Sequence, residues 1–194
     1  MNLFGIAIKN VLHRPLQTAL SFILLAFGVG MISLLMLLEV QLHKEFDRNI
    51  KDIDMVLGAK GSPLQLILAN VYHIDAPTGN IKLNDARNLM KHPFVEEAIP
   101  LAYGDNYQMW RIVGTEPSYP NHYGVTVSEG KIWQEDFESV IGARVAVESG
   151  LTIGDTFYSS HGLTDTTDVH TNKTFKVVGI FEESGSVIDQ LILC

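Results

Sequence analysis

Apolar residues dominate one segment near the start of the chain, and an alternating pattern follows it. Residues 15–38 read PLQTALSFILLAFGVGMISLLMLL and contain no charged side chain. A helix of this length measures ~36 Å, more than the ~30 Å hydrocarbon core of a bilayer. The apolar stretch is about twice as long as that of a cleaved secretory signal, and no small-residue cleavage site precedes Glu39. The pattern therefore predicts an uncleaved transmembrane helix over residues 15–38.

The helical period continues beyond this apolar segment into residues 39–55. Charged side chains there lie mostly off one apolar stripe, which we expect to stiffen a helical stalk: Leu42, Phe46, Ile50 and Ile53. The segment has no Gly or Ser, the residues that make a tether flexible. The pattern predicts a rigid stalk helix that could transmit motion from the membrane.

The first 14 residues, MNLFGIAIKNVLHR, show apolar positions at roughly helical spacing. They predict a short amphipathic helix on the inner membrane face, separated from the transmembrane helix by a break at Pro15. The alternative is that they only lengthen the transmembrane helix or fray. Lys9 and Arg14 precede the apolar segment without an acidic residue, so we expect a cytoplasmic N-terminus.

Four small residues share one face of the predicted transmembrane helix. They lie within about 60° of one another at 100° per residue, and they are Ala19, Ala26, Gly30 and Ser33. Such a stripe lets another helix approach closely. Small residues are also common in any membrane helix, so the stripe predicts a packing face without proving one.

Residues 56–194 alternate between helical and strand patterns. Ser62 before Pro63 marks a helix start, Asn84 a second one, and Gly150 a helix end. Alternating or apolar runs predict strands around residues 54–57, 95–103, 107–116, 139–141, 156–158, 174–185 and 187–194. The predicted fold class is an α+β extracytoplasmic domain on one long transmembrane and stalk α-helix.

The charge distribution separates the two parts of the chain. Residues 1–38 carry two basic and no acidic residues, whereas the remainder carries 12 basic and 22 acidic residues, a net charge of −10. We expect no nucleic acid as a partner for so acidic a surface, because phosphate binding requires a basic patch. Cys194 is the single cysteine, so this chain forms no internal disulfide and its outer domain must rely on its own core.

The segment GAKGS, residues 58–62, suggests a phosphate-binding loop at first sight. A nucleotide P-loop requires the spacing G-x-x-x-x-G-K-[ST], but here Lys60 is followed by Gly61. In the predicted orientation the segment also lies outside the cell, where nucleoside triphosphates are scarce. We therefore interpret GAKG as a turn before a helix.

Other candidate chemistry is equally weak. A possible metal cluster has irregular spacing in a polar loop: His161, Asp165, Asp168 and His170. His73 with Asp75 fits loop hydrogen bonding better than ligation, and the aromatic residues Tyr103, Tyr107, Trp110 and Trp133 fit a core better than a ligand cleft. No Gly-x-Ser-x-Gly elbow occurs. We expect no enzyme activity and no catalytic, cofactor or metal site.

Four stretches resemble, in order, the permease subunits of MacB-like and FtsX-like ATP-binding-cassette systems. They are AIKNVLHRPLQTALSFILLAFGVG, VLGAKGSPLQLILANVYHIDAPTGNI, VIGARVAVESGLTIGDTF and FKVVGIFEESGSVID. Together they cover nearly the whole chain, and the second, similar to one branch of permeases, is the most specific. The resemblance implies a MacB-like core domain at residues 56–194 that is incomplete, since three further membrane helices are expected downstream.

The resemblance also implies a function and partners. Such permeases dimerise in the inner membrane and pair with a cytoplasmic ATPase, and motion along the stalk drives export or extraction of a substrate at the outer face. The resemblance identifies neither the substrate nor the ATPase. Two other readings stay open: a single-pass sensor with an extracytoplasmic ligand-binding domain, and a membrane-anchored extracytoplasmic enzyme.

Overall fold

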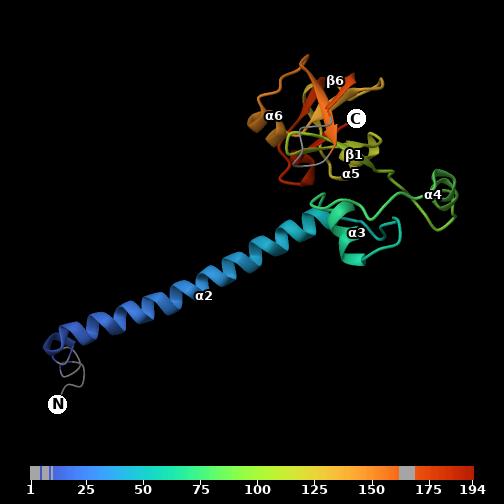
Figure 1. Cartoon of the computed structure of the whole chain (residues 1–194). Coiled ribbons are helices and arrows are strands. Elements are labelled where there is room, and N and C mark those ends of the chain that lie inside the picture. The colour runs from blue at the N-terminus through green and yellow to red at the C-terminus, as the bar shows by residue number, and fades with distance from the viewer. Residues whose placement is uncertain (1–4, 6–8, 10, 162–168) are drawn as a thin grey trace. The chain divides into compact units, whose positions relative to one another are not determined.

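The computed structural model describes residues 5, 9, 11–161 and 169–194, with only the backbone described at 161 and 169–173. The chain divides into two compact units, Met1–Asp47 and Arg48–Cys194. Nearly all of the described residues of the first unit are helical, whereas the second unit contains strands and short helices (Figure 1). The mixed α and β composition of the second unit confirms the predicted fold class.

Helix α2 spans Pro15–Ile50 without a break, so residues 15–38 and the start of the predicted stalk form one helix. It is long and apolar enough to cross a membrane. The helix ends at Ile50, earlier than residue 55, because a turn at residues 51–52 places Asp52 at φ 54°, outside the right-handed helical region. The prediction that Ile53 continues the helical stalk is therefore wrong. Most of the predicted helix 1–14 lies outside the described residues; Val11, Leu12 and His13 are helical.

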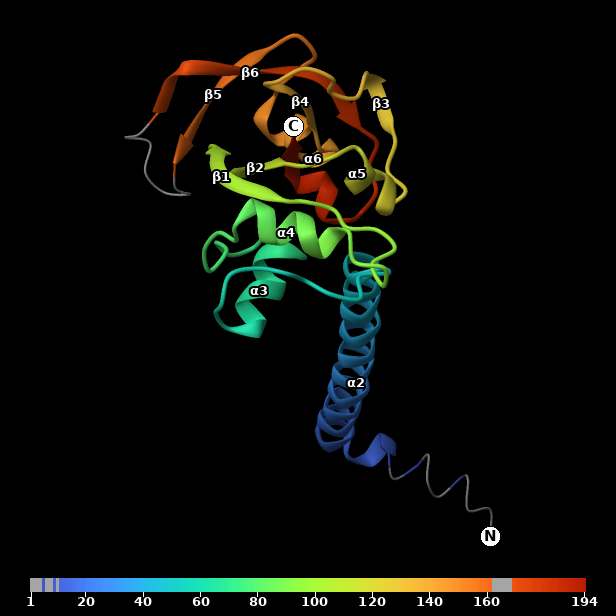
Figure 2. The ribbon, with the colours of Figure 1, turned by 90° about the vertical axis from the view of Figure 1, so that its right-hand side faces the viewer.

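Among its described residues, the second unit has five short helices: α3 (Pro63–Asn70), α4 (Leu83–Met90), α5 (Ser118–His122), α6 (Ala143–Ser149) and the 3-10 helix η1 (Val187–Gln190). Ser62 precedes α3 as its N-cap, with Pro63 in the first turn, as predicted. Helix α4 begins one residue before the predicted cap Asn84, and Lys82 occupies the N-cap. Both whole-chain views place α3 and α4 outside the sheet (Figures 1 and 2).

Seven strands form one sheet in the order β3-β6-β4-β7-β2-β1-β5. Strand β6 also pairs with β5, so the sheet closes on itself and hides most of its edges. The central strand β7 pairs with β2 in parallel and with β4 in antiparallel fashion. The strands are β1 (Ala102–Tyr107), β2 (Trp110–Gly114), β3 (Val127–Gly130), β4 (Glu138–Ile141), β5 (Thr156–His161), β6 (Val169–Phe181) and β7 (Leu191–Leu193).

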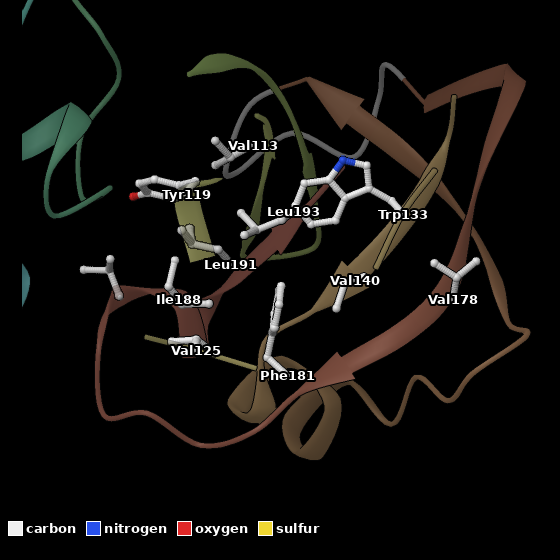
Figure 3. Packing of buried hydrophobic residues seen from close by; sticks show 11 residues of the cluster. Val113, Tyr119, Val125, Trp133, Val140, Val178, Phe181, Ile188, Leu191 and Leu193 are labelled. Atoms are coloured by element: carbon white, nitrogen blue, oxygen red, sulfur yellow. The ribbon is translucent and has the colours of Figure 1, made fainter. Parts of the chain in front are cut away.

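Two clusters of buried apolar residues fill the interior of this sheet. In the first, side chains from β2, β6, β7 and α5 gather around Trp133, Phe181 and Leu193 (Figure 3). The second joins Ile112, Ile192 and Phe175 on β2, β7 and β6. Trp110, Trp133 and Tyr103 belong to or pack against these clusters, as the core reading of the aromatic residues predicts.

Five predicted strands are wrong in whole or part. Residues 54–57 and 95–101 form no strand, and residues 187–190 form η1 before the short β7 begins. Of residues 107–116 only Trp110–Gly114 form β2, after a turn at residues 108–109, and residues 182–185 lie beyond the end of β6. An extended apolar run becomes a strand only where a neighbouring strand offers hydrogen bonds, which local patterns do not reveal. By contrast, Gly150 ends α6 at φ 74°, and Gly154 turns toward β5 at φ 98°, as their positions predict.

Candidate functional site

The predicted packing face and stalk stripe lie on α2. All four small residues are exposed on the helix, and, apart from its two chain neighbours and the backbone of its own helix, nothing lies within 4 Å of the position that a Cβ on Gly30 would occupy. Leu42, Phe46 and Ile50 are also exposed and lie on the same helix. A partner helix at the stripe and a mechanical role for the stalk stay predictions.

The last residues of α2 are hydrogen-bonded to residues 137 and 138 positions away in the sequence. Arg48 Nη1 donates to the Gly185 carbonyl oxygen at 2.8 Å. The Val187 backbone N–H donates to Asn49 Oδ1 at 3.1 Å, and Asn49 is only 8% exposed. The helix end is therefore held against the segment that leads into η1. We call Arg48, Asn49 and Lys51, with their bonded partners, the helix junction.

A second element, α5 and the residue after it, holds the same helix end through backbone atoms. The Tyr123 hydroxyl donates to the Asn49 carbonyl oxygen at 3.2 Å, and His122 Nε2 donates to the Lys51 carbonyl oxygen at 2.6 Å. These two carbonyls belong to the helix C-terminus, where backbone acceptors lack partners within the helix. The end of α2 is thus hydrogen-bonded both by the segment that leads into η1 and by the end of α5.

Asp189 organises the loop that receives Arg48. Its carboxylate accepts hydrogen bonds from the backbone N–H groups of Ser184 and Gly185 at 2.9 and 2.6 Å, and from the Ser184 hydroxyl at 2.8 Å. Gly185 has φ 68°, and a Cβ there would collide with the Arg48 guanidinium. The close approach of Arg48 to this loop therefore depends on Asp189, which holds the loop backbone, and on Gly185, which has no Cβ.

A buried polar network lies next to the junction. His73 Nε2 is 2.6 Å from the Tyr119 hydroxyl, and His73 Nδ1 is 2.9 Å from the Tyr103 hydroxyl. The Tyr119 ring meets Tyr123 edge to face, with centroids 5.5 Å apart. Through Tyr123, the network touches the Asn49 carbonyl. We call His73, Tyr103, Tyr119 and Tyr123 the His73 network.

Burial determines the protonation of this network. It lowers the pKa of His73 to about 3, with a further contribution from the positive charge of Arg111. A neutral imidazole has one donor and one acceptor nitrogen, so one tyrosine donates to His73 and the other accepts from it. Burial also raises the pKa values of Tyr103, Tyr119 and Tyr123, which keeps their hydroxyls protonated.

The glycines of GAKGS serve close packing. A Cβ on Gly58 would collide with the Leu66 side chain on α3, and a Cβ on Gly61 with the Thr78 side chain. Thr78 in turn donates from Oγ1 to the Ala59 carbonyl oxygen at 2.8 Å. The segment is folded back on residues 76–80, in keeping with its interpretation as a turn.

The residues singled out as possible metal ligands are placed only in part. No group of three or more His, Cys, Asp or Glu side chains that could hold a metal ion occurs in the part of the chain that the structure describes. Asp165 and Asp168 lie outside the described residues, as do the side chains of His161 and His170. Asp75 accepts from the Ala76 N–H at 2.7 Å, a local loop bond that fits its structural reading.

Sequence reasoning missed the junction, although one signal was present. On a helical wheel Asn49 lies at the edge of the stripe of Leu42, Phe46 and Ile50. A polar residue beside an apolar stripe suggests a buried hydrogen bond, but its partner Val187 could not be identified from sequence.

Comparison with solved structures gives remote similarity to two extracytoplasmic domains. The chain is 16% identical to the periplasmic region of MacB from Actinobacillus actinomycetemcomitans, with a TM-score of 0.40, covering 59% of this chain and 54% of that one. It is 15% identical to the extracellular domain of the noncanonic ABC-type transporter YknZ from Gram-positive bacteria, with a TM-score of 0.36, covering 58% and 60%. The chain thus spans little more than half the length of these structures.

A search of curated proteins gives no match. The family described as MacB-like periplasmic core domain, in contrast, matches residues 18–193, which include most of the predicted transmembrane helix and the whole sheet. This match covers far more than half of the chain, so the chain belongs to the family of MacB-like periplasmic core domains.

Proposed function

We propose that this chain is part of a permease subunit in an ATP-binding-cassette transport system and that α2 carries mechanical work to the outer domain. In this proposal residues 15–38 cross the inner membrane, the N-terminus is cytoplasmic and residues 48–194 lie outside. A cytoplasmic ATPase supplies the movement, a second permease copy packs on the small-residue stripe, and the outer domain drives export or extraction of a substrate.

The observation that carries this proposal is that α2 is unbroken and that its C-terminal end is hydrogen-bonded within the second unit. Helix α2 runs through residues 15–50 without interruption. Its last turn is then hydrogen-bonded through Arg48 and Asn49, by side chains and by a backbone carbonyl. A displacement of the helix along or about its axis would pull on η1 and α5 together, because both are bonded to the same turn.

Mechanical transmission can be tested by changing only the stiffness of the stalk. Seven Ala residues inserted after Gln41 keep the helix and, at about 100° per residue, nearly preserve its phase. Seven alternating Gly and Ser residues at the same point add the same number of residues but make the connection flexible. Both variants are purified from host membranes with the co-purifying ATPase.

The readout is the nucleotide-dependent change in hydrogen exchange at the Val187 amide. We expect the native chain and the Ala insertion to respond to ATP, and the Gly/Ser insertion to lose the response while still binding the ATPase. An equal response from both insertions would contradict transmission through the helix. Failure of any ATPase to co-purify with the native chain would contradict the proposed partnership.

A further inference from the structure

One open cavity in the outer domain has a composition unlike that of the chain as a whole. It measures about 290 Å³ and is lined by the segment after α3, the β1–β2 turn, α6 and η1. Its charged lining residues are Arg111, Arg144 and Glu148, a net positive charge of one, whereas the whole chain has a net charge of −8. We call this cavity the Arg111 groove.

The two arginines differ in how they are engaged. Arg144 Nε is paired with Glu148 Oε1 at 2.6 Å along α6, so these charges offset each other. Arg111 Nη2 donates a long hydrogen bond of 3.5 Å to the Ile74 carbonyl oxygen. A guanidinium has five N–H donors in a planar fork that matches carboxylate and phosphate groups. The groove therefore favours an anionic group beside Arg111.

Apolar side chains accompany this arginine. Ile74 is 68% exposed and Met109 is 66% exposed, both large apolar residues at the groove, and Trp110 lines it from β2. Met109 occupies the two-residue β1–β2 turn beside Gln108, whose φ of 53° lies in the left-handed region. Exposed apolar residues that gather around a cavity mark binding sites more often than those scattered singly.

We propose that the Arg111 groove binds a free, single-chain amphiphilic anion. Its carboxylate or phosphate group would accept hydrogen bonds from Arg111, and a short hydrocarbon chain would cover the exposed Ile74 and Met109. The volume lies at the lower end of the ~300–1,000 Å³ typical of small-molecule sites, which fits a short chain better than a folded partner. Opposite charge at the head and apolar contact along the chain both contribute to recognition.

The groove also shares a residue with the helix junction: Val187 lines the groove and donates its backbone N–H to Asn49 Oδ1. His73 lines the groove as well, and its network reaches the Asn49 carbonyl through Tyr123. An occupied groove would therefore bias the end of α2. This link rests on the proposed function, whereas ligand binding itself does not.

The test uses the full chain in phosphatidylcholine nanodiscs, because detergents are themselves amphiphiles. Octanoate and octyl phosphate are titrated while tryptophan fluorescence and heat of binding are followed. Octanol lacks the charge and acetate lacks the chain, so we expect each to bind at least tenfold more weakly than octanoate. Equal binding of octanol and octanoate, or no saturable binding of either anion, would overturn the proposal.

Variants separate the charge from the apolar contact. Arg111→Gln should weaken octanoate binding roughly tenfold or more, since a hydrogen bond to a charged group contributes at least about one tenfold step. Arg111→Lys should retain part of the affinity, and Arg87→Gln on α4 should leave it unchanged. If Arg111→Gln unfolds, Ile74→Ser at an exposed position tests the same site and should weaken octanoate but not acetate.

Two further outcomes would contradict the inference. One is native affinity for octanoate in both Arg111→Gln and Ile74→Ser. The other is a tryptophan fluorescence response to phosphatidylglycerol vesicles in the absence of a response to octanoate, which would make a bilayer lipid the ligand. No ATPase is present in this assay, so its failure leaves the proposed transport function untouched.

Discussion

The long helix and the outer domain use apolar side chains in opposite ways. Along residues 15–38 the Leu, Ile and Phe side chains are exposed, whereas the outer domain encloses its apolar residues in two clusters. The apolar surface of the helix therefore requires lipid or a partner helix to cover it, while the outer domain has a core of its own. The hydrogen bonds of the helix junction all lie within the second unit, Arg48–Cys194.

The largest effect should come from a cavity in the closed sheet. Ile192 is fully buried on β7 and faces Ile112 in parallel register. We expect Ile192→Ala to lower the free energy of unfolding of the outer domain by about 2–5 kcal/mol. Urea denaturation of the full chain in nanodiscs, followed by tryptophan fluorescence, measures this change. Leu24→Ala, at an exposed position of α2, is the control, and an equal loss in both variants would break the contrast between the two regions.

A smaller effect is expected at the junction. Asn49→Ala removes the acceptor of the buried Val187 N–H, so the outer domain should lose about 1–3 kcal/mol. Lys51→Ala is the matched control, since Lys51 takes part only through its backbone carbonyl in the contact with His122. The same urea titration compares the two. A loss below about 0.5 kcal/mol for Asn49→Ala would show that the helix end is not held by this bond.

The His73 network should make the outer domain sensitive to acid. Burial and Arg111 lower the pKa of folded His73 to about 3, while an unfolded histidine titrates near 6.5. The stabilisation is complete above about pH 6.5 and is lost as the pH falls toward 3, because only the unfolded chain binds the proton in this window. The slope should reach about 1.4 kcal/mol per pH unit.

The control for this pH dependence is His73→Asn. Asparagine tolerates the left-handed conformation that His73 adopts at φ 54° but does not titrate. Stability of both proteins is measured by urea denaturation from pH 7 to pH 4, and their difference cancels the contribution of the carboxylates. Identical slopes would contradict a buried, neutral His73.

The smallest effect on stability should come from the membrane helix itself. Gly30→Leu fills the small-residue stripe and should lower cross-linking between chain copies in membranes, with less than about 0.5 kcal/mol change in the outer domain. Gly28→Leu adds the same side chain on the opposite side of α2, at about 100° per residue. An equal cross-linking yield for both variants would contradict the proposal that a second copy packs on the small-residue stripe.

The elements that were predicted correctly from the sequence are those set by residues close together in the chain. The uncharged run before Glu39, the Ser62-Pro63 start of α3 and the left-handed Gly150 each act within a few residues, and the structure has these elements. The closure of the sheet by β5 and β6 depends on strand pairing over longer distances, and no local pattern indicates it.

The site was harder to predict than the fold for the same reason. Helical spacing predicted the apolar stripe of the stalk. It did not predict where α2 ends, because the helix stops just before Asp52, which adopts a positive φ. Asn49 and Val187 are 138 positions apart, and His73 meets Tyr103 and Tyr119 only after the sheet has formed. These contacts follow from tertiary packing.

The most direct test asks whether the end of α2 is held firmly by the outer domain. Spin labels at Gln41 on the helix and Val147 on α6, in a Cys194→Ala background, would report one distance by double electron–electron resonance in nanodiscs. We predict a single narrow distribution for the otherwise native chain and a broader one for Asn49→Ala. A broad distribution in the otherwise native chain would contradict the claim that the helix junction transmits motion.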